Sequence, residues 1–264
     1  MIDLHCHVLA GIDDGPETIA DSVALARAAA SLGTRTIVAT PHVSWSYRND
    51  SHTIARLVEE ANTAFAAAGL TLNVVGGAEI AMTRLADLAS DELSALALGN
   101  GPWLLIECPF SSVAIGLDSL LLDVQDQGHR IVLAHPERCP AFHRDPRMLE
   151  SLVDGGVLTS ITAGALVGRF GGTVQRFALG LLEGEMVHNV ASDAHDSDHR
   201  KPGMAAELEQ AGLGPLSGWL TDAVPAAILR GEETIPPRPA FAVPSVETLR
   251  RPWWRRRSLL RRAS

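Results

Sequence analysis

A short apolar run, a polar residue, a loop and a stretch of helical periodicity follow one another repeatedly along this sequence. Most of the apolar runs are unbroken, as in strands that are buried on both faces. Strands that alternate with helices pair in parallel through right-handed crossovers. We therefore predict an α/β fold, a distorted (β/α)7 barrel of the TIM type. The seven runs expected to form its strands span residues 2–4, 36–39, 72–75, 103–106, 131–134, 157–161 and 187–191.

The stretches between the apolar runs carry signals for the start and end of helices. Pro16 is expected to open the first helix, which ends before Gly33, because proline suits the first turn and glycine the position after the last. Ser51 is expected to cap the second helix, which ends before Gly69. Further helices are expected over about 84–98, 117–127, 146–153, 172–182 and 204–211.

The length of 264 residues, 46% of them hydrophobic, is enough for one sizeable core. We expect one folded domain over residues 1–234, a Pro-rich linker over 235–249 that begins IPPRPAFAVP, and a basic tail over 250–264. No run of 18 apolar residues predicts a transmembrane helix, and the N-terminal residues do not resemble a signal peptide. Three cysteines do not make a disulfide framework, so we expect a cytoplasmic protein.

Charge is distributed unevenly along the chain. The net charge of −9 includes seven arginines in the tail, so residues 1–249 carry −16. An acidic body argues against a nucleic-acid partner and suits a protein that gathers carboxylates around metal ions. The tail has two interpretations: its arginines and the interspersed Trp253, Trp254, Leu259 and Leu260 lie on an anionic membrane surface, or it is a disordered, solubilising end.

Side chains that bind metal ions follow six of the seven predicted strands. Residues just past the strands of a parallel barrel converge on one face, and residues i and i+2 of one strand point the same way. A single such histidine is usually structural, but packing does not account for the whole set. Asp13 and Asp14, in GIDDG, add carboxylates, one of which could instead stabilise a turn or cap a helix. The strand-end side chains are His5, His7, His42, Glu79, Glu107, His135, Asp193 and His195.

This set of nitrogen and oxygen ligands predicts a metal centre with more than one ion. Such ligands suit Mn²⁺, Fe or Zn²⁺ and argue against a thiolate site. The set is too large for one ion, so we expect two or three divalent ions. Mn²⁺ is the metal we expect, with Fe or Zn²⁺ as alternatives.

The order of these motifs resembles that of the PHP superfamily of polymerases and histidinol phosphatases. Within it, residues 1 to about 230 are similar to the bacterial tyrosine phosphatases of capsule and exopolysaccharide operons, the CpsB/CapC type. The stretches that carry the resemblance are HCHVLAGIDDG, IVATPH, AHPER, AGALVGRFG and ASDAH.

The resemblance implies a role for each ligand. A first ion would be held by His5, His7, Glu79 and Asp193, a second by Glu79 as a bridge with Glu107 and His135, and a third by Asp14, His42 and His195. Arg138 and Arg200 match positions that contact the substrate phosphate. Their guanidinium groups can clamp phosphoryl oxygens while metal-activated water attacks in line.

The resemblance further implies a metal-dependent phosphomonoesterase (a protein-tyrosine-phosphatase). Its expected substrate is the phosphotyrosine-bearing tail of a membrane-bound bacterial tyrosine kinase that controls capsule or exopolysaccharide synthesis. The alternatives are a PHP phosphatase acting on histidinol phosphate or a sugar phosphate, a nuclease, which the acidic body argues against, and a non-catalytic regulatory subunit of polysaccharide export.

Other nucleophiles and phosphate-binding loops find little support in the sequence. No cysteine (Cys6, Cys108 or Cys139) has an arginine six residues later, as a cysteine phosphatase loop needs. The segment CPFSSVAIG after Glu107 departs from the pattern of relatives and is expected to shape substrate access. The turn GRFGG at 168–172 makes Arg169 or Phe170 a candidate for lining the site.

Overall fold

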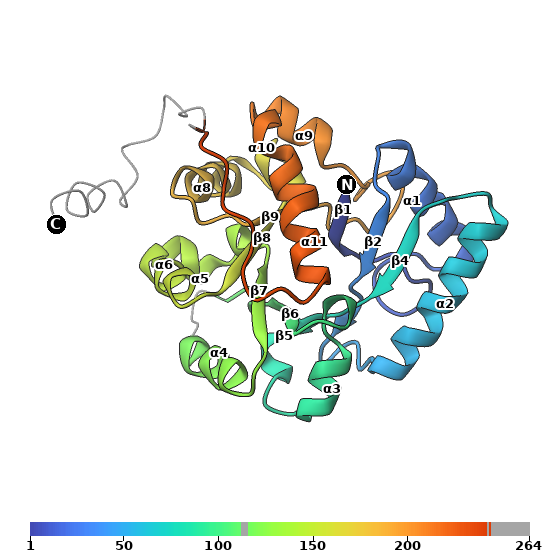
Figure 1. Cartoon of the computed structure of the whole chain (residues 1–264), viewed down its shortest axis with the longest axis horizontal. Coiled ribbons are helices and arrows are strands. Elements are labelled where there is room, and N and C mark those ends of the chain that lie inside the picture. Colours follow the sequence, from blue (N-terminus) through green and yellow to red (C-terminus); the bar gives the residue numbers. More distant parts are fainter. Residues whose placement is uncertain (112–115, 242, 244–264) are drawn as a thin grey trace, which may run out of the picture.

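The computed structural model describes residues 1–111, 116–241 and 243, and within them parallel strands form a barrel surrounded by helices (Figure 1). One sheet has the order β1-β2-β4 and the other the order β3-β5-β6-β7-β8-β9. All of these neighbours pair in parallel, as predicted. The strands are β1 (Ile2–Cys6), β2 (Thr36–Ala39), β3 (His42–Val43), β4 (Asn73–Gly76), β5 (Glu79–Ala81), β6 (Trp103–Glu107), β7 (Arg130–Ala134), β8 (Leu158–Thr162) and β9 (Asn189–Ala191).

Two of the seven predicted barrel strands are each followed, after a two-residue break, by a short additional strand that lies outside the predicted run. Thr40 and Pro41 separate β2 from β3, and Gly77 and Ala78 separate β4 from β5. A Cβ on Gly77 would lie 2.9 Å from side-chain atoms of both Val38 and Leu98, so this break requires a glycine. The breaks divide the barrel into two sheets, and a parallel bridge between Cys6 and Ala194 closes it at the other seam. The prediction of a distorted seven-unit barrel is confirmed.

The helices follow the strands in sequence and lie outside the barrel (Figure 1). The α-helices are α1 (Ile19–Ser31), α2 (Ser51–Ala67), α3 (Ser90–Ala95), α4 (Leu117–Asp126), α5 (Pro140–Arg144), α6 (Pro146–Asp154), α7 (Ala163–Leu166), α8 (Gly172–Glu183), α9 (Ala205–Gln210), α10 (Gly214–Gly218) and α11 (Val224–Leu229). The shorter turns are η1 (Met82–Arg84), η2 (Leu98–Asn100), η3 (Pro136–Arg138) and the π-turn η4 (Trp219–Ala223).

Two predicted helix starts were wrong because side chains outside the expected positions cap the helices. Thr18 caps α1 in a reciprocal capping box with Asp21, so the helix begins three residues after Pro16. Asp50, and not Ser51, caps α2 by accepting a hydrogen bond from the backbone NH of Thr53 at 2.7 Å. The helix predicted over 84–98 is replaced by turns and the short α3.

The segment α10–η4–α11 closes the N-terminal end of the barrel, where the strands begin. Asn189, at the start of β9, donates a hydrogen bond from Nδ2 to the Leu220 carbonyl oxygen at 2.9 Å. Trp103, at the start of β6, donates from Nε1 to the Glu232 carbonyl oxygen at 3.0 Å. The opposite, C-terminal end of the barrel therefore remains the place for a functional site.

The barrel strands are buried on both faces, as their unbroken apolar sequences predict. In β6 the side chains of Leu104, Leu105 and Ile106 are inaccessible to solvent. Among the described residues, no helix is long and apolar enough to cross a membrane. The basic tail over 250–264 and linker residues 242 and 244–249 lie outside the described residues. Of the linker, Pro236 accepts a hydrogen bond from Trp219 Nε1 at 2.9 Å.

Candidate metal centre

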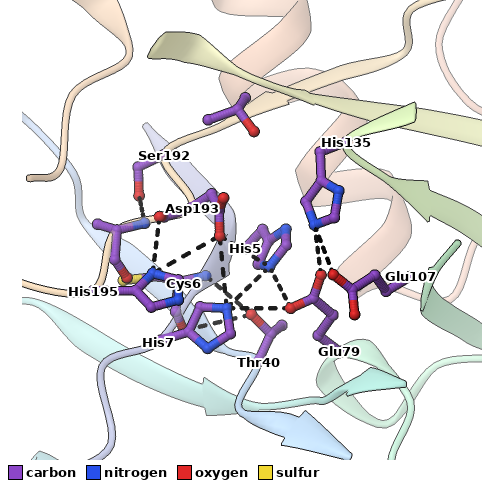
Figure 2. Close-up of polar contacts among 12 residues, drawn as sticks. His5, Cys6, His7, Thr40, Glu79, Glu107, His135, Ser192, Asp193 and His195 are labelled. Atoms are coloured by element: carbon purple, nitrogen blue, oxygen red, sulfur yellow. Dashed lines mark hydrogen bonds and ion pairs between the residues drawn. The ribbon is translucent and has the colours of Figure 1, made fainter. Parts of the chain in front are cut away.

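All of the predicted ligands come together at the C-terminal end of the barrel. Figure 2 shows most of them: His5 is in β1 and His7 directly follows it, Glu79 begins β5, Glu107 ends β6, and His135, Asp193 and His195 lie in the segments after β7 and β9. His5, His7, Glu79, His135, Asp193 and His195 are at most 4% exposed. Burying so many ionisable groups at one end of a barrel is costly, which indicates a functional site.

Glu79 lies at the middle of the cluster and contacts four imidazoles. Its Oε2 is 3.2 Å from His5 Nε2, 3.3 Å from His7 Nε2 and 3.1 Å from His42 Nδ1. Its Oε1 is 2.8 Å from His135 Nε2. Burial opposes its ionisation, but the neighbouring imidazoles keep the pKa of the Glu79 carboxyl well below its usual range. The carboxylate is therefore ionised, and its two oxygens face different imidazoles, so each oxygen is available to bind a metal ion.

A second group of ligands lies around Asp14. Its Oδ1 is 3.2 Å from His195 Nε2 and 3.5 Å from His42 Nε2. The Nδ1 of His195 donates a hydrogen bond to the carbonyl oxygen of Asp193 at 3.0 Å, which leaves Nε2 without a proton. This Nε2 is buried and makes no hydrogen bond. An unprotonated, unsatisfied imidazole nitrogen aimed at carboxylates fits a metal ion.

Four groups of side chains each bring ligand atoms within 4.8 Å of one another. Several residues belong to two groups, so the groups form one continuous centre. The groups are His7 with Asp14, His42 and His195; His5 with His7 and Asp193; His5 with Glu79 and His135; and His42 with Glu79 and Glu107.

The structure separates the roles of Asp13 and Asp14, the two acids of GIDDG, which the sequence left open. Its Oδ2 lies 2.7 Å from His7 Nδ1 and accepts a hydrogen bond from the backbone NH of His42 at 3.0 Å. Asp13 therefore holds His7 from behind, whereas Asp14 faces the other ligands. The loop also requires Gly15, because a Cβ there would lie 2.6 Å from the His7 carbonyl oxygen.

Two of the predicted ligands adopt a backbone conformation that is rare for residues other than glycine. His135 has φ 32° and Asp193 has φ 53°. Hydrogen bonds hold both: the His135 NH donates to the Ser160 carbonyl oxygen and the Asp193 NH to the His5 carbonyl oxygen, at 2.8 and 2.9 Å. Backbone strain of this kind gathers at functional sites, and here it aims both side chains at the cluster.

Burial and neighbouring charges move the pKa values of two adjacent predicted ligands, Glu107 and His135, in opposite directions. Burial, reinforced by the Glu79 charge, raises the pKa of Glu107 to about 8. Burial, reinforced by Arg138, lowers the pKa of His135 to about 4. His135 is therefore a neutral imidazole at pH 7, the form that binds a metal ion, whereas Glu107 needs a nearby cation to ionise fully.

The two predicted arginines border the cluster and share one carboxylate. Arg138 Nη2 is 2.8 Å and Arg200 Nη2 is 3.1 Å from Asp193 Oδ2, and Arg200 Nη1 is 3.4 Å from Asp14 Oδ2. The Arg138 side chain is 14% exposed and that of Arg200 is 40% exposed. Two guanidinium groups beside a metal-binding cluster can bind an anion that also contacts the ions.

The cysteines take no part in the ligand groups formed by the described residues. Cys6 is buried, and its Sγ contacts the Ala194 carbonyl oxygen at 3.7 Å, away from the metal-binding side of β1. Cys108 and Cys139 are also buried. This arrangement agrees with the prediction that Cys6 packs in the core.

Comparison with known proteins identifies the family. The model of the family described as capsular polysaccharide synthesis, CpsB/CapC, matches residues 1–211. The chain belongs to the CpsB/CapC family. Tyrosine-protein phosphatase YwqE of Bacillus subtilis is 39% identical to this CpsB/CapC chain over 199 residues, which are 74% of the chain and 78% of the relative. Tyrosine-protein phosphatase CpsB of Streptococcus pneumoniae is 30% identical over 214 residues, 77% of this chain and 86% of the relative.

A solved structure agrees with the family assignment. The crystal structures of YwqE from Bacillus subtilis and CpsB from Streptococcus pneumoniae are described as metal-dependent tyrosine phosphatases. The match has a TM-score of 0.79 at 34% identity and covers 91% of this CpsB/CapC chain and 100% of the solved chain. Dihydropyrimidinase from Brevibacillus agri matches at TM-score 0.52 and 14% identity over 89% of the chain and 72% of that structure, which concerns the fold alone. The family and the ligand groups together indicate a centre for divalent metal ions.

Proposed function

We propose that this chain is a metal-dependent protein tyrosine phosphatase. Hydrolysis breaks the bond between phosphorus and the phenolic oxygen, and releases tyrosine and inorganic phosphate. The observation that carries the proposal is the position of Arg138 and Arg200, which lie within hydrogen-bond distance of Asp193 at the edge of a buried His and carboxylate cluster. Phosphatase relatives at 39% and 30% identity support the same activity.

The proposed ligand assignment is the one that the family resemblance implies. One ion would be held by His5, His7, Glu79 and Asp193, a second by Glu79, Glu107 and His135, and a third by Asp14, His42 and His195. The ligand groups within 4.8 Å of one another support a centre of this kind, and the unsatisfied His195 Nε2 supports the third position. We propose two or three ions, with Mn²⁺ favoured over Fe or Zn²⁺. Such ions supply a water-derived nucleophile near neutral pH and offset negative charge on phosphoryl oxygens.

The chain's own residues bind and orient the phosphate. Arg138 and Arg200 both contact Asp193 through its Oδ2, so a phosphate arriving at the centre meets two guanidinium groups already held in place. Planar guanidinium groups bind two phosphoryl oxygens at once, and they stabilise the charge that develops on those oxygens. The carboxylate of Asp193 would then be shared between the metal ion and the arginines.

We further propose where the enzyme acts. The family description concerns capsular polysaccharide synthesis. The proposed substrate is the phosphotyrosine-bearing tail of a membrane-bound bacterial tyrosine kinase that controls this synthesis, and the proposed location is the cytoplasm. The basic tail over 250–264 would bring the enzyme to the inner face of the membrane.

The test is hydrolysis of a phosphotyrosine peptide by chelator-stripped protein, with Mn²⁺, Mg²⁺, Zn²⁺ or no metal added back. We expect no turnover without metal and restored turnover with Mn²⁺. His135→Ala should abolish turnover while circular dichroism shows an unchanged fold. Histidinol phosphate, assayed in parallel, tests the small-molecule alternative. A folded protein that hydrolyses no phosphotyrosine peptide with any metal would overturn the proposal.

A further inference from the structure

Two exposed phenylalanines lie beside the arginine proposed to bind phosphate. Phe110 is 61% exposed and Phe170 is 36% exposed. The guanidinium carbon of Arg138 is 5.8 Å from the centre of the Phe110 ring and 4.9 Å from the centre of the Phe170 ring. Exposed apolar surface that is gathered in one place and bordered by polar residues is typical of a binding site.

The barrel topology explains why the two rings flank the arginine. The strands β6, β7 and β8 are consecutive neighbours in the sheet. Phe110 follows β6, Arg138 follows β7, and Phe170 follows β8 and the short α7. The three side chains therefore come from three adjacent strand ends, with the arginine in the middle.

Both rings are held by local structure. The Phe110 ring is stacked on His135, with centroids 5.8 Å apart and an interplanar angle of 16°. The residue before it, Pro109, accepts a weak hydrogen bond from Cys139 Sγ at 3.8 Å. The turn that carries Phe170 is bounded by Gly168 and Gly171, which have φ values of 82° and 90°. These positive φ values favour glycine and set the direction of the turn.

Phe170 also lies close to α7. A Cβ on Gly164 would lie 3.4 Å from Cε2 of Phe170 and 3.0 Å from Cδ of Arg169. The neighbouring Arg169 points elsewhere and forms an ion pair with Glu207. Of the two sequence candidates in GRFGG, Phe170 is therefore the one that contacts Arg138.

We infer that Phe110 and Phe170 form a binding site for the aromatic ring of the substrate and select aryl over alkyl phosphates. The inference rests on the proposed function, because it takes Arg138 as a phosphate ligand. In phosphotyrosine only one oxygen atom separates the phosphorus from the ring, so the ring lies beside whatever binds the phosphate. The two phenylalanines offer apolar ring surface at that place, where offset or edge-to-face contacts are favourable.

The first experiment measures ring preference without turnover. Metal-loaded protein is titrated with phenylphosphonate and methylphosphonate, which carry the same anionic group and are not hydrolysed. We expect the phenyl compound to bind about tenfold more tightly, and the difference to disappear in a Phe110→Leu/Phe170→Leu variant. Equal affinities in the unsubstituted protein would overturn the inference whatever the outcome of the phosphatase assay.

The second experiment measures selectivity in catalysis. Phosphotyrosine and phosphoserine peptides of the same sequence are compared by kcat/KM. The double leucine variant should lose about tenfold on the phosphotyrosine peptide and little on the phosphoserine peptide, and Phe110→Tyr should retain the preference. Leu122→Ala, which removes a 56% exposed apolar side chain from α4, is the matched control and should change neither.

The two experiments separate the inference from the proposed function. Equal losses of kcat/KM on both peptides would overturn the inference. So would a loss that is explained by reduced metal content, because Phe110 contacts His135 and would then only support the metal centre. If the unsubstituted protein hydrolyses neither peptide, the proposed phosphatase activity is overturned instead. The phosphonate titration still decides the ring preference in that case.

Discussion

Asp13 Oδ2 lies 2.7 Å from Nδ1 of His7, and this contact fixes which nitrogen of His7 faces the ligand cluster. The Nε2 of the same ring is 3.3 Å from Glu79 Oε2. Although burial opposes protonation, the contacts with Asp13 and Glu79 raise the pKa of His7 to about 10. Asp13 is thus a positioning residue for a proposed metal ligand.

Replacing Asp13 should weaken metal binding without unfolding the protein. Loss of a carboxylate that orients a metal-binding histidine typically lowers metal affinity about 10–100-fold. We expect Asp13→Ala to show this loss and Asp13→Asn a smaller one, because asparagine can still accept a hydrogen bond. Metal titration by calorimetry, with circular dichroism as the fold control, measures both. Unchanged affinity in Asp13→Ala would contradict the positioning role.

The two arginines should contribute unequally to catalysis. Arg138 is more buried than Arg200, so its contact with phosphate is less screened by solvent. We expect Arg138→Ala to lower kcat/KM on a phosphotyrosine peptide about 100–1,000-fold, and Arg200→Ala roughly tenfold. Metal content should stay the same in both variants. An Arg138→Ala enzyme with full activity would remove this residue from the proposed phosphate site.

Stability of the metal-free protein should fall as pH rises from about 6.5 to 8. Burial and the Glu79 charge raise the pKa of Glu107 to about 8, so the folded state retains a proton that the unfolded state has lost. The pKa of His7 is raised from 6.5 to about 10, so above pH 6.5 His7 also lowers the free energy of unfolding as pH rises. Thermal melts of chelator-stripped protein across this range measure the slope, which should be shallower in Glu107→Gln.

Bound metal ions should remove most of this pH dependence, because they offset the charge of Glu107 and displace the proton from His7. The melts are therefore repeated with Mn²⁺. A slope that is the same with and without metal, or the same in Glu107→Gln, would show that these groups do not titrate as described.

The membrane hypothesis for the basic tail makes its own prediction. Each arginine near an anionic lipid surface contributes about 1 kcal/mol, and residues 250–264 contain seven. A chain that ends at residue 249 should no longer sediment with anionic liposomes, while its activity on a soluble phosphotyrosine peptide stays unchanged. If both forms sediment equally, the tail is not the membrane contact.

The sequence predicted the positions of the ligands well because parallel strands of a barrel end on one face. His42, Glu79 and His135 could be assigned to that face from strand ends alone. The separate roles of Asp13 and Asp14 could not, since they depend on which way a loop turns around Gly15. The break between β4 and β5 was also hidden, because it follows from packing of Gly77 against Val38 and Leu98.

The start of α1 and the position of Phe110 were also not predicted from the sequence, the first for a local reason and the second for a non-local one. The start of α1 is determined by the capping box of Thr18 and Asp21, and not by Pro16, which is a competing start signal in the same stretch. The sequence marks Phe110 only as part of the distinctive segment after Glu107. Its place next to Arg138 and Phe170 follows from the order of β6, β7 and β8, which only the closed barrel shows.

The seam where β1 meets the segment after β9 joins the earliest part of the fold to one of the latest. His5 and His7 flank Cys6 on one side of that seam, and Asp193 and His195 flank Ala194 on the other. The proposed ion positions that need ligands from both sides therefore stay incomplete in a growing chain until residues 193–195 have been made. Closing a loop of this length is slow compared with forming local helices. In the proposed ligand assignment, an ion that takes ligands from both sides of the seam would therefore be bound only after the barrel has closed.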